Sequence, residues 1–214
     1  MYSQPLVSII TPSFNQARFL EQTMRSVLEQ DYPNIEYIVI DGGSSDGSLE
    51  IIQKFADRLA YWQSQKDKGQ TDAINQGFAR TTGEILAWLN SDDILYPGAV
   101  SAAVRQLQEH PEVGMVYGDC HWINAEGEII GNFPAAQTDL KKLRRGYVHI
   151  PQQTAFFRAD LWLKVGPLDD SFYFAMDYDL WTRLAEQAPL LYVPGFRAAF
   201  RLHEGAKSIA ADDR

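Results

Sequence analysis

The sequence predicts an α/β fold with a mainly parallel central sheet. The runs LVSIIT (6–11), IEYIVI (35–40) and EILAWL (84–89) are short, apolar and typical of buried strands. The segments between them place apolar residues three and four positions apart, as on one face of a helix. Because strands and helices alternate about every thirty residues, we expect βαβ units, whose strands are parallel.

The remaining elements of the first half follow from the same patterns. Further strands are expected over 59–63 and 113–117. The expected helices are 18–30, one that follows the turn GGSSDGS, 71–80, and one from about 97 to 110. Ser45 or Asp46 suits the cap of the second helix, and Pro97 suits the first turn of the last.

After residue 119 the regular alternation ends. A hairpin is expected around Glu126–Gly127, followed by TAFFR (154–158), a helix over 177–187 and a last strand near 198–202. We therefore expect one domain over 1–214. Its first half, about 1–119, would form the ligand-binding α/β layer, and its mixed second half, about 120–214, would close over it.

Composition and charge exclude several classes of protein. The 214 residues are 45% hydrophobic with a formal net charge of −9, which does not attract nucleic acid. Cys120 is the single cysteine, so an internal disulfide framework is excluded and a reducing compartment is favoured. Apolar runs are too short to span a bilayer. We expect a cytoplasmic protein, with peripheral association at the inner face of the membrane left open.

In the segment EILAWLNSDDILYPG (84–98), an apolar run typical of a buried strand is followed directly by acidic residues. Asp92 and Asp93 follow this strand, and Asp41 follows 35–40. In open α/β sheets ligands bind beyond the carboxyl ends of the strands, and Mg²⁺ or Mn²⁺ prefers carboxylate and phosphate oxygens. On spacing alone, a solvated turn of Asn, Ser and Asp explains the segment better than a metal site.

The wider sequence resembles a known family. The segments VSIITPSFNQARFLEQTMRSVLEQDYPNIEYIVIDGGSSDGSLEII, KDKGQTDAINQGFARTTGEILAWLNSDD and FAMDYDLWTRLA, within about 6–208, resemble the family-2 glycosyltransferases. The resemblance implies a GT-A-like fold, which is a Rossmann-type sandwich with a smaller mixed acceptor region. It also implies inverting, hexosyltransferase-type transfer from a UDP- or dTDP-sugar with Mn²⁺ or Mg²⁺, as in the synthesis of cell envelope polysaccharide.

The resemblance also implies the donor site. Asn90-Ser91-Asp92 matches the family's Asp-x-Asp motif with Asn in the first place, so Asp92 is the implied metal ligand. His203 in RLHEGAKS is the second implied ligand, with a surface histidine as the alternative. The implied nucleotide-binding residues are Thr11, Pro12, Phe14, Asn15, Asp41, Asp67, Lys68, Asp72, Asn90 and Ser91.

Two of these positions have simpler explanations. Asp41 would accept a hydrogen bond from the base of the donor, or would only shape the turn beside Gly42. Asp72 would contact the donor, or would only be the usual acid at a helix start. A dinucleotide-binding dehydrogenase is rejected because TPSFNQ, after the first strand, lacks the required glycines.

The segment AMDYDLW resembles the family's Glu-Asp-x-Asp segment, with Met176 in place of the Glu. Asp177 is then the implied general base, and a helix N-cap is the alternative. Weaker candidates near the sugar and the acceptor are Asp119, His149, Gln152 and Gln153, with Arg201 or Lys207 supplying positive charge. The acceptor can be a saccharide, a lipid-linked intermediate or a protein. The alternative functions are a sugar-nucleotide-binding protein without transfer activity and a nucleotidyltransferase.

Overall fold

The computed structural model describes residues 4–205 and 207. Its strands are β1 (Val7–Ser13), β2 (Ile35–Asp41), β3 (Tyr61–Ser64), β4 (Ile85–Trp88), β5 (Ile94–Leu95), β6 (Met115–Ile123), β7 (Ile129–Asn132), β8 (Phe156–Arg158) and β9 (Leu190–Arg201). Its α-helices are α1 (Ala17–Leu28), α2 (Ser48–Lys54), α3 (Gln70–Phe78), α4 (Ala99–Glu109), α5 (Leu140–Leu143), α6 (Ala159–Val165) and α7 (Met176–Ala185). Short 3₁₀ turns span Ala56–Arg58 and Gln152–Thr154.

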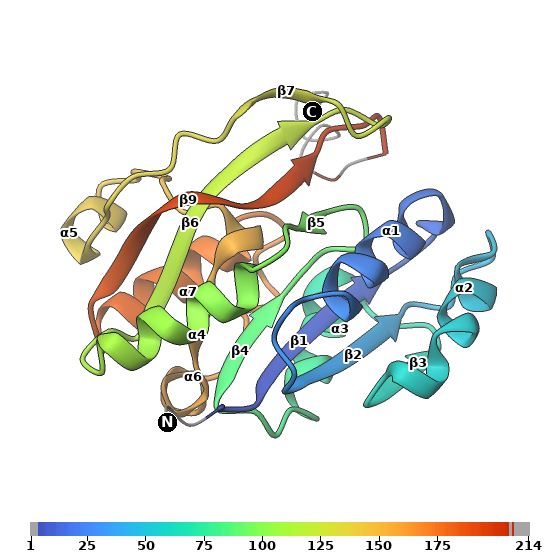
Figure 1. Ribbon diagram of the computed structural model, residues 1–214, viewed down its shortest axis with the longest axis horizontal. Helices are drawn as coiled ribbons and strands as arrows, with labels where there is room; N and C mark the ends of the chain where they lie inside the picture. Colours follow the sequence, from blue (N-terminus) through green and yellow to red (C-terminus); the bar gives the residue numbers. More distant parts are fainter. Residues whose placement is uncertain (1–3, 206, 208–214) are drawn as a thin grey trace.

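Within the described residues the strands form one sheet in the order β3-β2-β1-β4-β8-β6-β9-β5, with β7 paired to β6. The first four strands in this order are parallel, as predicted. Helices cover both faces (Figure 1): α1, α2 and α4 share one apolar cluster, and α3, α6 and α7 share the other. The predicted α/β class is confirmed.

The second half of the sheet is mixed. β8 is antiparallel to both β4 and β6, whereas β6 and β9 are parallel and run side by side (Figure 1). β6 and β9 are both longer than the strands predicted over 113–117 and 198–202. Their pairing shifts register between Tyr117 and Cys120, and this irregularity lets β6 continue past Gly118 and Asp119. Asp119 accepts hydrogen bonds from the Tyr192 hydroxyl and the Gly195 N–H, both at 2.6 Å.

Two predicted helix starts are shifted in the structure. The N-cap residue of α2 is Gly47, with φ 100°, rather than Ser45 or Asp46. Asp46 instead accepts the N–H of Ser48 at 3.1 Å and the N–H of Ala17 at 2.9 Å, so it joins the starts of α2 and α1. Pro97 precedes α4, because Gly98 with φ 81° takes the N-cap position. Glycine adopts these backbone angles without a steric cost.

Helix α3 packs closely on β1 at Gly77. A Cβ atom at this position would lie 2.5 Å from Cγ2 and 2.8 Å from Cγ1 of Ile10. Gly77→Ala should therefore lower the free energy of unfolding by about 1–3 kcal/mol, although alanine favours a helix by about 1 kcal/mol. Denaturant titration measures the loss. Because Ile10→Ala removes both close atoms, Gly77→Ala should cost less in that background; equal costs in the two backgrounds would exclude the clash.

No helix in the described part of the chain is long and apolar enough to cross a membrane.

Candidate functional site

A cavity of about 920 Å³ opens beyond the carboxyl ends of β1, β2 and β4. The first half of the chain contributes loops that follow these strands, and the second half contributes the start of α7. Among the polar residues that line the cavity are Lys66, Asp67, Gln70, Asn90, Ser91, Asp92, Gln152, Gln153, Asp177 and Lys207. The carboxyl ends of the strands therefore carry the cavity, as the sequence predicts for an α/β ligand site.

Asp92 and His203 meet at the edge of this cavity. Asp92 Oδ2 and His203 Nε2 lie 3.0 Å apart, and both side chains are largely buried. The His203 ring also packs on Phe19, with the ring centroids 4.6 Å apart. The two residues implied as metal ligands, 111 positions apart in sequence, are thus brought into direct contact.

The donor set fits a cation whose coordination is completed by a ligand. A carboxylate and an imidazole are accepted by Mn²⁺, and Mg²⁺ accepts a single carboxylate. No group of three or more His, Cys, Asp or Glu that could hold a metal occurs among residues 4–205 and 207. Asp92 and His203 would therefore need oxygens from a bound diphosphate and from water, which is how Mg²⁺ is usually held beside phosphates.

The adjacent Asp93 has a different task. It is fully buried, and its two oxygens accept from the Arg201 N–H at 3.0 Å, the Gln153 amide at 2.9 Å and the Asn90 amide at 3.2 Å. Burial, and then the neighbouring charge of Asp92, raise the pKa of Asp93 well above its usual value. Only Asp92 of the two adjacent acids lines the cavity, whereas Asp93 is held inside the fold by these three hydrogen bonds.

Asn90 connects the strand end to both halves of the cavity. Its Oδ1 accepts from Gln70 Nε2 at 2.8 Å, and its Nδ2 donates to Asp93 and, at 3.3 Å, to Gln152 Oε1. An amide can donate and accept at once, which a carboxylate in its place could not do. Gln70 was missed by the sequence analysis because a neutral side chain at a helix start gives no distinctive signal.

Asp177 lies in the first turn of α7 and lines the cavity. The N-cap position belongs to Ala175, with φ 61°, so Asp177 is not the cap residue. Burial raises the pKa of Asp177, while the N–H of Tyr178 and the charge of Lys207 work against that rise. The structure thus places the Asp177 carboxyl group in the lining of the cavity.

Lys207 is the cation opposite Asp177. Its Nζ donates to Gln70 Oε1 at 3.1 Å and lies 4.4 Å from the centre of the Tyr173 ring. Burial lowers its pKa, and Asp177 raises it. Arg201, the other basic candidate, instead donates to the carbonyl oxygens of Asp92 and Ala125 and stabilises the framework. Among the described residues, positive charge in the lining of the cavity therefore comes from Lys207 and Lys66.

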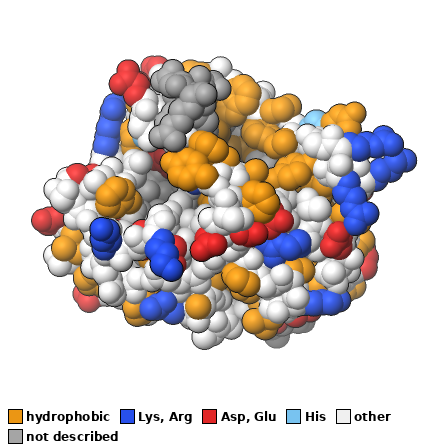
Figure 2. Space-filling view, turned by 180° about the vertical axis from the view of Figure 1, so that it is seen from behind, with side chains coloured by type: hydrophobic (Ala, Val, Ile, Leu, Met, Phe, Trp, Pro, Cys, Tyr) orange, Lys and Arg blue, Asp and Glu red, His pale blue; other side chains and the backbone are white. Residues whose placement is uncertain are grey.

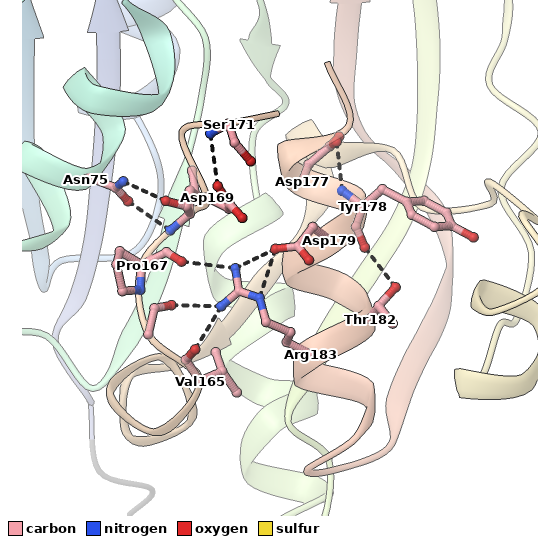
Figure 3. Close-up of polar contacts among 12 residues, drawn as sticks. Asn75, Val165, Pro167, Asp169, Ser171, Asp177, Tyr178, Asp179, Thr182 and Arg183 are labelled. Atoms are coloured by element: carbon pink, nitrogen blue, oxygen red, sulfur yellow. Dashed lines mark hydrogen bonds and ion pairs between the residues drawn. The ribbon is translucent and has the colours of Figure 1, made fainter. Parts of the chain in front are cut away.

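Arg183 fixes the segment that leads to α7 (Figure 3). It donates to the carbonyl oxygens of Val165 at 2.8 Å, Gly166 at 3.1 Å and Pro167 at 3.0 Å, and it pairs with Asp179 at 2.8 Å. In Figure 3 Asp177 points away from this cluster, although Asp179 points into it.

The side-chain amide of Asn75 on α3 holds the next residue, Leu168. Its Nδ2 donates to the Leu168 carbonyl oxygen at 2.9 Å, and its Oδ1 accepts the Leu168 N–H at 3.0 Å. Together these contacts of Arg183 and Asn75, which we call the clamp, tie residues 165–168 to α7 and α3. The loop that follows, 169–175, carries Tyr173 and Phe174 into the lining of the cavity.

The clamp leads to a prediction about Arg183. Arg183→Lys keeps the charge but loses the planar fork that reaches three carbonyl groups. We expect the free energy of unfolding to fall by about 1–3 kcal/mol, since these are hydrogen bonds to a charged group. Denaturant titration measures this loss. Arg105→Lys, at an exposed position of α4, is the matched control; equal stability of both variants would show that the clamp contributes nothing.

The residues expected at the donor base divide into two groups. Pro12 and Phe14 line the cavity. Thr11 is buried and its hydroxyl pairs with the Tyr37 hydroxyl at 2.9 Å. Asn15, with φ 52°, binds Ser44 and Ser45 and so ties the loop after β1 to the loop after β2.

Asp41 is fully buried beneath the loop that follows β2. Its carboxylate accepts from the N–H groups of Gly43 and Ser44 and from the hydroxyls of Ser44, at 2.5 Å, and Ser64, at 2.7 Å. Gly42 and Gly43, directly after it, line the cavity. The turn role is therefore present in the structure.

The loop before α3 brings one predicted acid to the cavity. Asp67 lines it, and burial raises the pKa of Asp67. Asp72 accepts the Lys68 N–H at 3.0 Å, which is the role of an acid at a helix start. Neither Lys68 nor Asp72 is among the lining residues, whereas Lys66 is.

The weaker candidates on the acceptor side also fall into two groups, those that line the cavity and those that do not. Gln152 and Gln153 line the cavity and are buried. Asp119 is engaged by β9, and His149 binds the Pro134 carbonyl oxygen at 3.1 Å. Neither of the last two lines the cavity.

Comparison with known families decides the identity of the chain. Residues 8–176 match the family model described as glycosyl transferase family 2. The chain belongs to this family. The match ends one residue before Asp177, so the role of that residue rests on the geometry above and on the resemblance of its segment.

Curated relatives agree with this assignment. An uncharacterised glycosyltransferase of Mycobacterium tuberculosis is 37% identical over 188 residues, which are 86% of this chain and 71% of the relative. Chondroitin synthase of Escherichia coli is 29% identical over 88% of this chain and 28% of its own length. The chain is thus a glycosyltransferase by family.

Solved glycosyltransferases share the fold. The fragment 1-349 of S. aureus TarS, in complex with UDP-GlcNAc, matches with a TM-score of 0.78 and 17% identity, over 94% of this chain and 60% of the fragment. A mannosyltransferase of Pyrobaculum calidifontis, in complex with GDP-Man and Mn²⁺, matches with a TM-score of 0.73 and 21% identity, over 95% of this chain and 59% of its own. The predicted GT-A-like fold is confirmed, and the chain spans about three fifths of these two solved chains.

Proposed function

We propose that this glycosyltransferase moves a sugar, with inversion, from a UDP- or dTDP-sugar to an acceptor hydroxyl, with Asp177 as general base and a divalent cation at Asp92 and His203. The observation that carries the proposal is the presence of both carboxyl groups in one cavity, with Asp92 bonded to His203 and Asp177 opposite Lys207. A single displacement needs one base and one site for the leaving diphosphate.

The reaction balances with the residues in place. The acceptor hydroxyl attacks the anomeric carbon, the bond from that carbon to the diphosphate oxygen breaks, and the electron pair leaves with the diphosphate. The hydroxyl proton passes to the Asp177 carboxylate. When bound, Mn²⁺ or Mg²⁺ would stabilise the charge that develops on the diphosphate. Lys207, held by Gln70, adds a fixed positive charge in the same cavity.

The choice of UDP or dTDP rests on Asp41. A carboxylate accepts the ring N–H of uracil or thymine. Asp41 is fully buried and does not itself line the cavity, so contact with a base requires the Ser44 hydroxyl, which donates to Asp41 Oδ1 at 2.5 Å, to rotate away. Gly42 and Gly43 expose only backbone to the cavity and let a ring approach. TarS was crystallised with UDP-GlcNAc, whereas the Pyrobaculum enzyme holds GDP-Man, so the base has to be tested.

Thermal shift with a panel of nucleotides tests the donor. UDP and dTDP should each raise the melting temperature in Mn²⁺ more than in EDTA, and GDP should raise it less. UDP release from UDP-sugars, with and without an added saccharide, then tests transfer. Stabilisation by GDP alone would overturn the assignment of Asp41, and stabilisation that ignores Mn²⁺ would overturn the metal site.

One observation supports a non-catalytic sugar-nucleotide-binding protein as second candidate. Met176 stands where the family has an acid, and its sulfur accepts the Thr71 hydroxyl at 2.8 Å in a buried contact. The same release assay separates the candidates, because donor binding without UDP release would favour the second. Membership of the glycosyltransferase family gives no support to a nucleotidyltransferase.

A further inference from the structure

The mouth of the cavity is bordered by a surface with two parts, which we call the mouth surface. One part is α5 with the segment after it, and the other is the loop before α7. Its exposed members are Lys141, Lys142, Arg144, Arg145, Tyr147, Val148, Phe172, Tyr173 and Phe174.

The apolar members are unusually open to solvent. Tyr147, Val148 and Tyr173 are 51%, 56% and 63% exposed. Exposed apolar patches of this kind mark surfaces that contact a partner or a membrane. Val148 and Tyr173 also line the cavity, so the patch is continuous with the site. The Tyr178 hydroxyl donates to the Leu143 carbonyl oxygen, which links α7 to α5 and holds the two parts together.

The basic members stand out against the acidic chain. The run 141–145 contains four cationic side chains, whereas the formal net charge of the whole protein is −9. On the face shown in Figure 2, Lys and Arg gather at the edge where α5 lies, beside hydrophobic side chains. Arg144 pairs with Glu186 at 2.8 Å, and Lys142 donates to the Gln137 carbonyl oxygen. Lys141 and Arg145 are exposed.

Acids near this surface reduce its charge without cancelling it. Asp139 is occupied as the N-cap of α5, where it accepts the Lys142 N–H at 2.8 Å. Asp169 and Asp170 precede the aromatic loop, and Asp169 accepts the Ser171 N–H at 2.9 Å. The positive charge is therefore concentrated on α5, and the loop before α7 contributes mainly aromatic surface.

We propose that the mouth surface docks on an anionic lipid bilayer. Clustered Lys and Arg are attracted to anionic headgroups, and exposed Tyr and Phe rings insert at the boundary of the acyl chains. The electrostatic attraction and the buried apolar area both add to the strength of binding. Docking would turn the cavity toward the bilayer. An acceptor carried in the membrane would then reach Asp177, a consequence that rests on the proposed function although docking itself does not.

Flotation of the whole chain with vesicles tests the proposal. The protein should float with vesicles of phosphatidylcholine and phosphatidylglycerol and should not float with phosphatidylcholine alone. K141Q/R145Q should weaken binding about thirtyfold, because each cation near an anionic surface contributes about 1 kcal/mol. Tyr147→Ser should also weaken it. The matched controls are R105Q/K164Q and Leu163→Ser, since Arg105, Lys164 and Leu163 are exposed on α4 and α6.

Three results would overturn the proposal: no flotation with either vesicle, equal binding by K141Q/R145Q and its control, or self-association in solution that Tyr147→Ser abolishes without any vesicle binding. Binding of an anionic polysaccharide in place of the vesicles would overturn it as well. UDP release measured without vesicles should be unchanged in K141Q/R145Q. This readout separates failure of docking from failure of the proposed reaction.

Discussion

Asp177→Asn should lower the turnover number for transfer by about 10²–10⁴-fold and leave the affinity for the nucleotide unchanged. Positioned general bases contribute rate factors of this size. Asparagine has the shape of the aspartate side chain but cannot take the proton of the acceptor hydroxyl. Turnover is measured as UDP release with acceptor, and affinity by calorimetry with UDP and Mn²⁺.

Asp179→Asn is the matched control for this variant. The two residues lie in the first turn of α7, but Asp179 turns toward Arg183 at 2.8 Å and Asp177 lines the cavity (Figure 3). Asp179→Asn should reduce stability through the clamp and keep turnover within a few-fold of the wild type. If Asp177→Asn turned over as fast as Asp179→Asn, the base assignment would be wrong.

The pH dependence gives an independent check. Because burial raises the pKa of Asp177, the acid limb of the pH–rate profile should lie at a higher pH than it would with an ordinary aspartate as the base. The rate should rise with pH through this pKa and then level off. In Asp177→Asn the residual rate should lose the limb. A limb at the position of an unburied aspartate would contradict the predicted environment.

Stability should move in the opposite direction to activity. A raised pKa in the folded state means that the native protein binds a proton more tightly than the unfolded chain. The stabilising contribution of this carboxyl group is therefore fully present below its pKa in the unfolded chain and is lost as the pH rises through its pKa in the folded protein. At neutral pH Asp177→Asn should melt at or above the wild-type temperature, and the difference should shrink in acid. A lower melting temperature at neutral pH would mean that lost activity reflects damage to the fold.

The sequence predicted the parallel half of the sheet well because its signals are local. Each strand there is an apolar run closed by Pro or polar residues, and each helix carries one apolar stripe. The long pairing of β6 with β9 could not be read in this way. Gly118 and Asp119 interrupt the apolar pattern, and only the register shift opposite Gly195 allows the strand to continue.

The site was predictable where the chemistry requires a charge. Asp92, His203 and Asp177 were predicted from the sequence as site residues, and the structure brings them to one cavity or its edge. Gln70 and Lys66 were not identified, because their place in the cavity depends on how α3 and its preceding loop pack. Conversely, Asp41 looks like a ligand in sequence, yet in the structure its carboxylate is filled by four hydrogen bonds from the chain itself.

Asp92→Asn should abolish the dependence of donor binding on Mn²⁺. Loss of an outer partner of a metal ligand typically costs ten- to a hundredfold in affinity, so loss of the ligand itself should cost at least about a hundredfold. UDP affinity, measured by calorimetry in Mn²⁺ and in EDTA, should become the same in both. Asp160→Asn, which removes an exposed carboxylate on α6, serves as control and should retain the full effect of Mn²⁺.

His203→Gln distinguishes a ligand from a structural partner. As a ligand, His203 binds the metal through Nε2, the atom that contacts Asp92 at 3.0 Å. As a structural partner it would only orient Asp92 by a hydrogen bond, which the glutamine amide can also donate. We expect His203→Gln to weaken Mn²⁺-dependent UDP binding by at least tenfold. If His203→Gln bound UDP normally in Mn²⁺ and Asp92→Asn did not, Asp92 would be the only protein ligand of the cation. If both variants bound UDP normally in Mn²⁺, neither residue would hold the metal.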